Sequence, residues 1–170
     1  MTEDELQEVL FYTTPITCLE EGYRDKVYLD SKGYPTIGYG WCICNKKHTK
    51  EDLKYFNMVM YEEAARITVE KHGEHLYNKL MMHPWFYNLS TERKAILIIC
   101  AYQTGYNNLL KFHNMIAALE KKDFVGAAHE MLDSHVAKYT APSRWARAAE
   151  IMRKDNFICI ELYHKELANR

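Results

Sequence analysis

The spacing of apolar residues predicts a short helix at the start of the chain. Leu6, Val9 and Leu10 fall on one side of a helix drawn through residues 2–12. The stretch that follows, 11–19, is apolar in part but contains one proline and three threonines. We interpret it as an entry segment that faces the core.

The pattern then changes to one typical of strands. Residues 26–43 are rich in valine, isoleucine, threonine and tyrosine, and turn-forming residues interrupt them at 30–33, at Gly38 and at Gly40. This pattern predicts a small, twisted antiparallel sheet with tight turns.

Helical periodicity dominates from Thr49 onward. Thr49 and Asp52 have the spacing of a capping box. Apolar residues then recur near helical spacing as far as residue 80, although Gly73 weakens the second half. We therefore expect one long helix over 50–80, of the kind that joins two lobes.

A second helix is expected to begin at Ser90 and Thr91, and residues 95–102 make it apolar on every side. Such a helix lies at the centre of a helical core. Shorter helices are predicted near 112–119, 123–135 and 142–156, with a tail of 14 residues after them.

Together these elements predict an α+β fold with two lobes. A small antiparallel sheet lobe and a mainly helical lobe would be joined by the long helix, with a cleft between them. We expect a single domain over 1–170. Its N-terminal lobe would span 13–60, and its helical lobe 75–170 together with the first helix. Clefts between lobes commonly carry the ligand site.

Composition and charge exclude several classes of protein. Lys plus Arg number 22 and Asp plus Glu 23, a net charge of −1, so we expect no nucleic-acid partner. The longest apolar run has eight residues, far short of the roughly 20 that span a membrane. The chain starts with acidic residues, unlike a secretory signal. We therefore expect the protein to stay in the cytoplasm of its producer unless something else exports it.

The cysteines predict neither a disulfide framework nor a metal site. Their number, five, is odd, and their spacing is irregular. Cys42, Cys44 and His48 resemble a ligand cluster, but a single residue separates the two cysteines and no second pair follows. We expect no metal and no cofactor, and interpret these residues as part of a strand and turn region.

Three polar residues carry the groups that glycoside hydrolysis requires. Glu21 comes at a helix end, Asp30 at the first sheet turn, and Thr36 in the following strand pattern. One carboxyl must donate a proton to the leaving oxygen, and the other must be ionised. Acidic residues near turns are also common without any catalytic role, so chemistry alone leaves both interpretations open.

The spacing of these residues supplies a longer motif. Glu-Gly at 21–22 follows a helix, Tyr-x-Asp at 28–30 leads into a turn, and Thr-Ile-Gly-x-Gly at 36–40 ends the run. This segment closely resembles the catalytic segment of the phage lysozymes of glycoside hydrolase family 24, the T-even phage lysozyme type. The resemblance extends along most of the chain through Tyr102-Gln103-Thr104-Gly105, Phe112, Phe124-x-x-Ala127-Ala128 and Pro142-x-Arg144-x-x-Arg147.

The resemblance implies a lysozyme-like fold and a muramidase that cuts the β-1,4 bond between N-acetylmuramic acid and N-acetylglucosamine in peptidoglycan. Glu21 would be the general acid. Asp30 would orient the water or stabilise the transition state, and Thr36 would help hold the water, which implies inversion. Arg144 would pair with Glu21. Glu20, one residue too early for the motif, is interpreted as a solvated helix-end charge.

Expected substrate contacts come from the same resemblance and from one position where this sequence differs from the family. Tyr102 and Gln103 are expected to contact sugar, although the apolar run that ends at Tyr102 also fits a residue of the core. Trp41 stands where the T-even lysozyme has histidine, so a charged pair would be absent and an aromatic ring would pack or line the cleft. Two basic clusters are either candidates to meet the carboxylates of the wall or simply solvated faces: Lys46, Lys47, His48 and Lys50, and Arg144, Arg147, Arg153 and Lys154.

The biological role implied is that of an endolysin that lyses the host at the end of phage infection. It would be a monomer, released to a thin Gram-negative wall through a holin-type membrane hole. A virion-delivered lysozyme, a lytic transglycosylase and a non-catalytic wall-binding protein remain alternatives. Asp30 and Thr36 favour hydrolysis over the last two.

Overall fold

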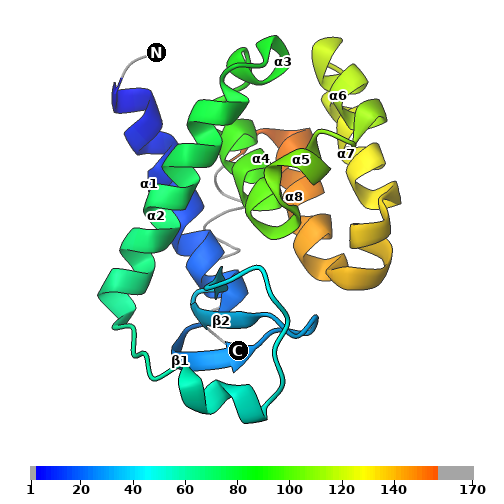
Figure 1. The fold of residues 1–170 in the computed structure, drawn as a ribbon. Helices are drawn as coiled ribbons and strands as arrows, with labels where there is room; N and C mark the ends of the chain where they lie inside the picture. The colour runs from blue at the N-terminus through cyan, green and yellow to red at the C-terminus, as the bar shows by residue number, and fades with distance from the viewer. Residues whose placement is uncertain (1–2, 157–170) are drawn as a thin grey trace.

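The computed structural model describes residues 3–156, which form eight α-helices, two short irregular helices and one three-stranded sheet (Figure 1). The predicted α+β class is confirmed. In chain order the elements are α1 (Glu3–Glu21), β1 (Arg24–Leu29), β2 (Pro35–Gly38), β3 (Trp41–Cys42), the 3₁₀ helix η1 (Glu51–Tyr55), α2 (Glu62–Leu80), α3 (Pro84–Tyr87), α4 (Thr91–Thr104), α5 (Tyr106–Leu109), α6 (His113–Glu120), α7 (Phe124–Asp133), the π-helical turn η2 (Val136–Thr140) and α8 (Pro142–Lys154).

The first helix is longer than the sequence predicted. We expected a helix over 2–12 and then an entry segment, but α1 runs through Pro15 to Glu21. The side chains that face α2 and α4, among them Val9 and Ile16, are buried. Burial of that face outweighs the single backbone hydrogen bond that proline removes. The extra turns carry Glu21 to the level of the sheet.

The sheet agrees with the prediction. Its strands are antiparallel in the order β1-β2-β3. Thr36 lies opposite Tyr28 on one side and Cys42 on the other, so it stands on the central strand. The turn at 30–33 joins the first two strands, as the Asp-Ser-Lys-Gly sequence indicated.

The predicted helix over 50–80 is wrong in its first part. Only half of the predicted capping box forms: Asp52 accepts from both the N–H and the hydroxyl of Thr49, but the Asp52 N–H donates to the Thr49 carbonyl and not to its hydroxyl. These bonds lie at the start of the short helix η1. The chain after η1 extends along β1, where Met60 N–H donates to the Asp25 carbonyl at 2.9 Å. Helix α2 begins at Glu62. Pairing with β1 holds these intervening residues out of the helix.

The central helix of the core is α4, as its all-round apolar sequence predicted. Every residue from Ala95 to Ala101 is buried, and α1, α2 and α8 pack around it. Gly73, which weakens α2 as a helix, permits close contact there: a Cβ at this position would lie 3.1 Å from Leu10 of α1. The last three predicted helices correspond to α6, α7 and α8, and the predicted tail lies outside the described residues.

A small second core joins the sheet to the helices. Cys18 of α1, Tyr39 after β2, and Ala65 and Val69 of α2 are buried against one another. In Figure 1 the sheet lies at the lower ends of α1 and α2, on the side away from α3. This cluster therefore fixes the end of α1 against the segment that follows β2. Among residues 3–156, no helix is both long and apolar enough to cross a bilayer.

Candidate active site

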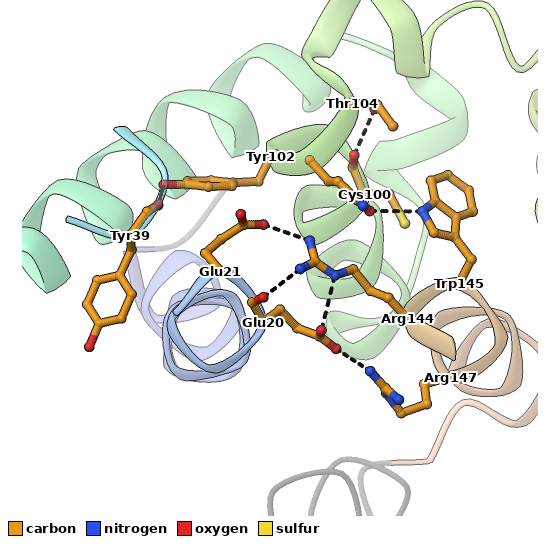
Figure 2. Close-up of polar contacts among 10 residues, drawn as sticks. Glu20, Glu21, Tyr39, Cys100, Tyr102, Thr104, Arg144, Trp145 and Arg147 are labelled. Atoms are coloured by element: carbon orange, nitrogen blue, oxygen red, sulfur yellow. Dashed lines mark hydrogen bonds and ion pairs between the residues drawn. The ribbon is translucent and has the colours of Figure 1, made fainter. Parts of the chain in front are cut away.

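Glu21, the last residue of α1, is bound by an arginine from the other end of the chain. Arg144, in the first turn of α8, donates from Nη1 to Glu21 Oε1 at 2.6 Å (Figure 2). Its Nε and Nη2 donate to the carboxylate and the backbone carbonyl of Glu20, at 3.1 and 2.7 Å. All three guanidinium nitrogens are thus engaged by α1, which fixes the side chain in one orientation.

Glu20 is not the solvated charge that we expected. Its side chain is 9% exposed, and its two carboxylate oxygens accept from Arg144 and from Arg147 Nη2, the latter at 2.6 Å. The two adjacent carboxylates at the end of α1 are therefore matched by two arginines one helical turn apart on α8. The sequence Glu-Glu at 20–21 and Arg-x-x-Arg at 144–147 is compatible with this arrangement, but the resemblance assigned only Arg144 to Glu21 and gave no partner to Glu20.

The second oxygen of Glu21 approaches the backbone after β2. A Cβ placed on Gly40 would lie 3.2 Å from Glu21 Oε2, and Gly40 has a φ of +78°, in the region that favours glycine. Glycine at this position therefore serves two purposes, the backbone conformation and the close approach of the carboxylate.

Asp30 and Thr36 are connected through the backbone of Tyr34. Asp30 Oδ1 accepts from the N–H groups of Lys32 and Tyr34, both at 2.8 Å. Thr36, 3% exposed, donates its hydroxyl to the Tyr34 carbonyl at 3.0 Å. The turn thus fixes one oxygen of Asp30, and no hydrogen bond within residues 3–156 engages the other.

Three rings from three elements contact one another in a row: Tyr102 of α4, His72 of α2 and Trp41 of β3. Tyr102 donates its hydroxyl to the Tyr39 carbonyl at 2.9 Å (Figure 2). Burial, and next the Glu21 carboxylate, raise the pKa of Tyr102. His72 packs edge-on against Tyr102 and Trp41, with ring centroids 5.1 and 5.9 Å away, and burial lowers its pKa. Trp41 is 41% exposed, which leaves ring surface open to a ligand.

One end of the Gln103 side-chain amide is already hydrogen-bonded within the protein. Its Oε1 accepts from the indole N–H of Trp145, at 2.9 Å. Trp145 is fully buried and stacks on Phe112 at a centroid distance of 5.4 Å. Only the amide NH₂ of Gln103 has no partner within the described part of the chain.

One of the two basic clusters has its charges already paired. Arg144 and Arg147 bind α1, while Arg153 and Lys154 both pair with Glu150. These ion pairs reduce the positive charge that this face presents to an anionic wall. The lysines of the other cluster, Lys46, Lys47 and Lys50, are exposed.

The cysteine segment holds no metal-ligand arrangement in the part described. Cys44 Sγ lies 3.6 Å from His48 Nε2, but Cys42 Sγ donates to the Cys44 carbonyl at 3.2 Å. No group of three His, Cys, Asp or Glu side chains among residues 3–156 could hold a metal ion.

The fold and the candidate site are compatible with one class of protein. Glycoside hydrolases use two carboxylates, and Glu21 and Asp30 lie at the end of α1 and at the first turn of the sheet. The family follows from comparison with known proteins: residues 19–144 match the family described as Phage lysozyme. The chain belongs to this family, as its motif predicted. It is a glycoside hydrolase of the lysozyme type, a muramidase, and its substrate is peptidoglycan.

The chain is also similar, at modest sequence identity, to individual proteins. The chain is 26% identical over 151 residues to "Probable T4-type lysozyme 1" of Dictyostelium discoideum, which covers 78% of this chain and 88% of that protein. Identity to "Probable T4-type lysozyme 2" of the same organism is 23% over 137 residues, covering 68% and 78%. Identity to "Pre-baseplate central spike protein Gp5" of Enterobacteria phage T4 is 29% over 135 residues, covering 68% of this chain and only 23% of the spike protein.

Proposed function

We propose that the chain cuts the β-1,4 bond between N-acetylmuramic acid and N-acetylglucosamine, with Glu21 as the general acid. The supporting observation is that Glu21 Oε1 accepts from Arg144, whereas Oε2 lies beside Gly40 and accepts no hydrogen bond within residues 3–156. A proton on Oε2 leaves the Arg144 bond intact, because a protonated carboxyl keeps an acceptor oxygen. That proton is donated to the leaving glycosidic oxygen.

Asp30 is the second carboxylate of this proposal. Its Oδ1 is held by the turn, so its Oδ2 is the oxygen that orients a water or stabilises the oxocarbenium-like transition state. Thr36 already donates its hydroxyl to Tyr34 and therefore meets that water as a hydrogen-bond acceptor. Attack by a water held in this way, on the face opposite the leaving group, inverts the anomeric carbon.

Three further residues contact the glycan in this proposal. Trp41 offers an exposed ring face for stacking on a sugar, and Tyr102 stands beside Glu21 in the same aromatic row. Gln103 donates its amide NH₂ to a hydroxyl or an acetamido oxygen, since its carbonyl is taken by Trp145. Arg144 acts through Glu21, as a positioning residue.

Digestion of purified Gram-negative peptidoglycan tests the chemistry. Wild type is expected to release muropeptides with reducing ends, and proton NMR of the first product is expected to show the inverted anomer. Glu21→Gln is expected to release none while unfolding at a temperature close to that of wild type. Wild-type-like digestion by a folded Glu21→Gln protein would refute the role of Glu21.

The two alternative activities have their own signatures. A lytic transglycosylase leaves an anhydro ring in place of a reducing end, because no water enters the reaction. A binding protein sediments with the wall and releases nothing. Either result would replace hydrolysis by Glu21 and Asp30 as the function of this site.

We propose that the biological role is host lysis at the end of phage infection, by a monomer that reaches the wall through a holin-type membrane hole. Expression in a Gram-negative cytoplasm is then expected to leave cells intact until their inner membrane is permeabilised. Lysis without permeabilisation would contradict the need for a holin. The identity to part of a phage spike protein keeps a particle-borne lysozyme as the second candidate, which detection of the chain in purified virions would establish.

A further inference from the structure

A second cluster of reactive side chains lies outside the proposed catalytic site, between β3 and η1. Cys44 Sγ lies 3.6 Å from His48 Nε2, and His48 Nδ1 lies 3.7 Å from Asp52 Oδ2. Thiol, imidazole and carboxylate in this order are the parts of an activated nucleophile, in which a base accepts the thiol proton and a third group orients the base.

The imidazole of His48 is held from several sides. Its ring packs edge-on against Phe56 with centroids 5.0 Å apart, and its backbone N–H donates to the Gly33 carbonyl at 2.9 Å. The side chain is 21% exposed. These contacts keep one ring nitrogen toward Cys44 and the other toward Asp52.

Asp52 is suited to the orienting role because it stays ionised. Its Oδ2 accepts from the backbone N–H of Thr49 at 2.8 Å and from the Thr49 hydroxyl at 3.0 Å. These hydrogen bonds, the backbone one first, lower the pKa of Asp52. An ionised carboxylate beside His48 stabilises the imidazolium that forms when the thiol proton is transferred.

The surroundings of Cys44 favour an anionic reaction partner. Lys46, Lys47 and Lys50 are exposed on the same segment, and a cluster of positive charge raises the local concentration of anions. Cys44 itself is partly exposed. The Lys46 carbonyl, 3.7 Å from Cys44 Sγ, is a second acceptor for the thiol proton, but it cannot carry that proton away.

We propose that Cys44, His48 and Asp52 form a thiol site that exchanges with small anionic disulfides, of which oxidised glutathione is an example. Cys44 attacks one sulfur of the disulfide as its proton passes to His48. An S–S bond forms to Cys44 and the original S–S bond breaks, and the departing thiolate takes the proton from His48. The products are a mixed disulfide on Cys44 and one free thiol.

Cys42 provides a matched control in the same segment. It is more exposed than Cys44, and its thiol donates to the Cys44 carbonyl. No imidazole contacts its sulfur within the described residues. Accessibility alone therefore predicts that Cys42 reacts faster, whereas the proposed site predicts that Cys44 does.

Timed reaction of the full, reduced chain with oxidised glutathione tests the proposal. Samples are quenched with an alkylating reagent, and the adduct on each cysteine is measured by peptide mass spectrometry. At neutral pH we expect Cys44 to react about tenfold faster than Cys42. An equal or faster reaction at Cys42 in the wild-type chain would overturn the proposal, and this comparison requires no variant.

Two variants test whether the His48 imidazole causes the faster reaction of Cys44. His48→Gln is expected to slow Cys44 about tenfold, to the rate of Cys42, whereas the same substitution at exposed His75 is expected to leave both rates unchanged. A Cys44 advantage that survives in a folded His48→Gln chain would refute the role of His48. The adduct would be attached beside the sheet that carries Thr36, since Ile43 N–H donates to the Pro35 carbonyl at 2.9 Å.

Discussion

Arg144 and Glu21 come from opposite ends of the chain, yet the guanidinium donates to the carboxylate at 2.6 Å. Their contact joins the last turn of α1 to the first turn of α8. The same arginine is anchored by Glu20 through two further hydrogen bonds. Glu20 thus positions Arg144, and Arg144 positions Glu21, so the two adjacent glutamates have different tasks.

The first prediction concerns the geometry of Arg144. Arg144→Lys keeps the charge but cannot make three planar hydrogen bonds at once. We expect kcat/KM for wall digestion to fall about 10- to 100-fold, which corresponds to the loss of about 1.5–3 kcal/mol from a hydrogen bond between charged groups. Turbidity kinetics on purified wall would measure it.

The same substitution on the exposed side of the helix is the control. Arg153 also lies in α8; within the described residues its ion-pair partner is Glu150, and 49% of its side chain is exposed. Arg153→Lys should leave both activity and thermal stability within error of wild type. Equal losses in the two variants would mean that lysine disturbs α8 as a whole, and would remove the case for a specific role of Arg144.

The second prediction separates Glu20 from Glu21. Glu20→Gln removes the carboxylate from ion pairs with Arg144 and Arg147, whose side chains and that of Glu20 are 9% to 18% exposed. Loss of one member of such a pair destabilises by about 3–5 kcal/mol when fully buried, and partial exposure should reduce this to about half. We expect a lower melting temperature with most of the activity retained.

Retention of activity follows from the remaining contacts of Arg144. Its bonds to Glu21 and to the Glu20 backbone carbonyl do not involve the substituted group. Glu21→Gln removes one ion pair where Glu20→Gln removes two, so it should lose less stability but all of the activity. Assays below the melting temperature of each variant would compare them. If Glu20→Gln were as inactive as Glu21→Gln while folded, the assignment of the acid would have to be reconsidered.

Glu20 also shows the limit of reading this site from sequence. The pairing of Arg144 with Glu21, 123 residues apart, was expected from the family resemblance and not from any local pattern. The burial of Glu20 depends on Arg147, 127 residues further on, and no local pattern contains that information. A charged residue at a helix end is exposed in most proteins, which is why we expected Glu20 to be solvated.

Tertiary contacts also explain the two errors in the helices. Propensity and Pro15 favoured an early end for α1, but burial of Val9 and Ile16 against α2 and α4 extends it. Periodicity favoured helix from residue 50, but the hydrogen bond from Met60 to Asp25 extends the chain along β1. The central helix α4 was predicted well because a helix that is apolar on every side must be surrounded by other parts of the protein.

The third prediction concerns the close approach at Gly40. Gly40→Ala places a Cβ 3.2 Å from Glu21 Oε2, and Arg144 restricts the movement of that carboxylate away from it. A misplacement of a catalytic group by about 1 Å can cost about 100-fold in rate, so we expect wall digestion to fall at least tenfold. Left-handed backbone in alanine adds about 1–2 kcal/mol of destabilisation.

Gly105 gives a control for the backbone cost alone. Its φ is +88°, and its nearest neighbour to an added Cβ is 4.0 Å away. Gly105→Ala should lose at least as much stability in urea unfolding, because φ +88° with ψ 144° disfavours any side chain, but it should keep its activity, because no catalytic side chain is displaced. Parallel losses of activity in the two variants would indicate that backbone strain, and not the contact with Glu21, determines the effect.

The last prediction is a pH dependence in the contact between α1 and α4. Lys94, which has a 3% exposed side chain, forms an ion pair with Glu5, and burial of Glu5 opposes this interaction. The hydrogen bond and the charge of Lys94 prevail, so the pKa of Glu5 is lowered from 4.5. The folded chain therefore keeps Glu5 ionised where the unfolded chain would protonate it. This stabilisation is present above pH 4.5 and is lost as the pH falls through the lower, folded-state pKa.

Glu5→Gln should remove this dependence. The difference in the free energy of unfolding between wild type and Glu5→Gln, measured by urea titration, should be largest near neutral pH and should shrink below about pH 4. Glu3→Gln, at an exposed position of the same first turn, should show no comparable trend. A difference for Glu5→Gln that stays constant from pH 7 to pH 3 would mean that packing of the side chain, and not the ion pair with Lys94, ties the start of α1 to the central helix.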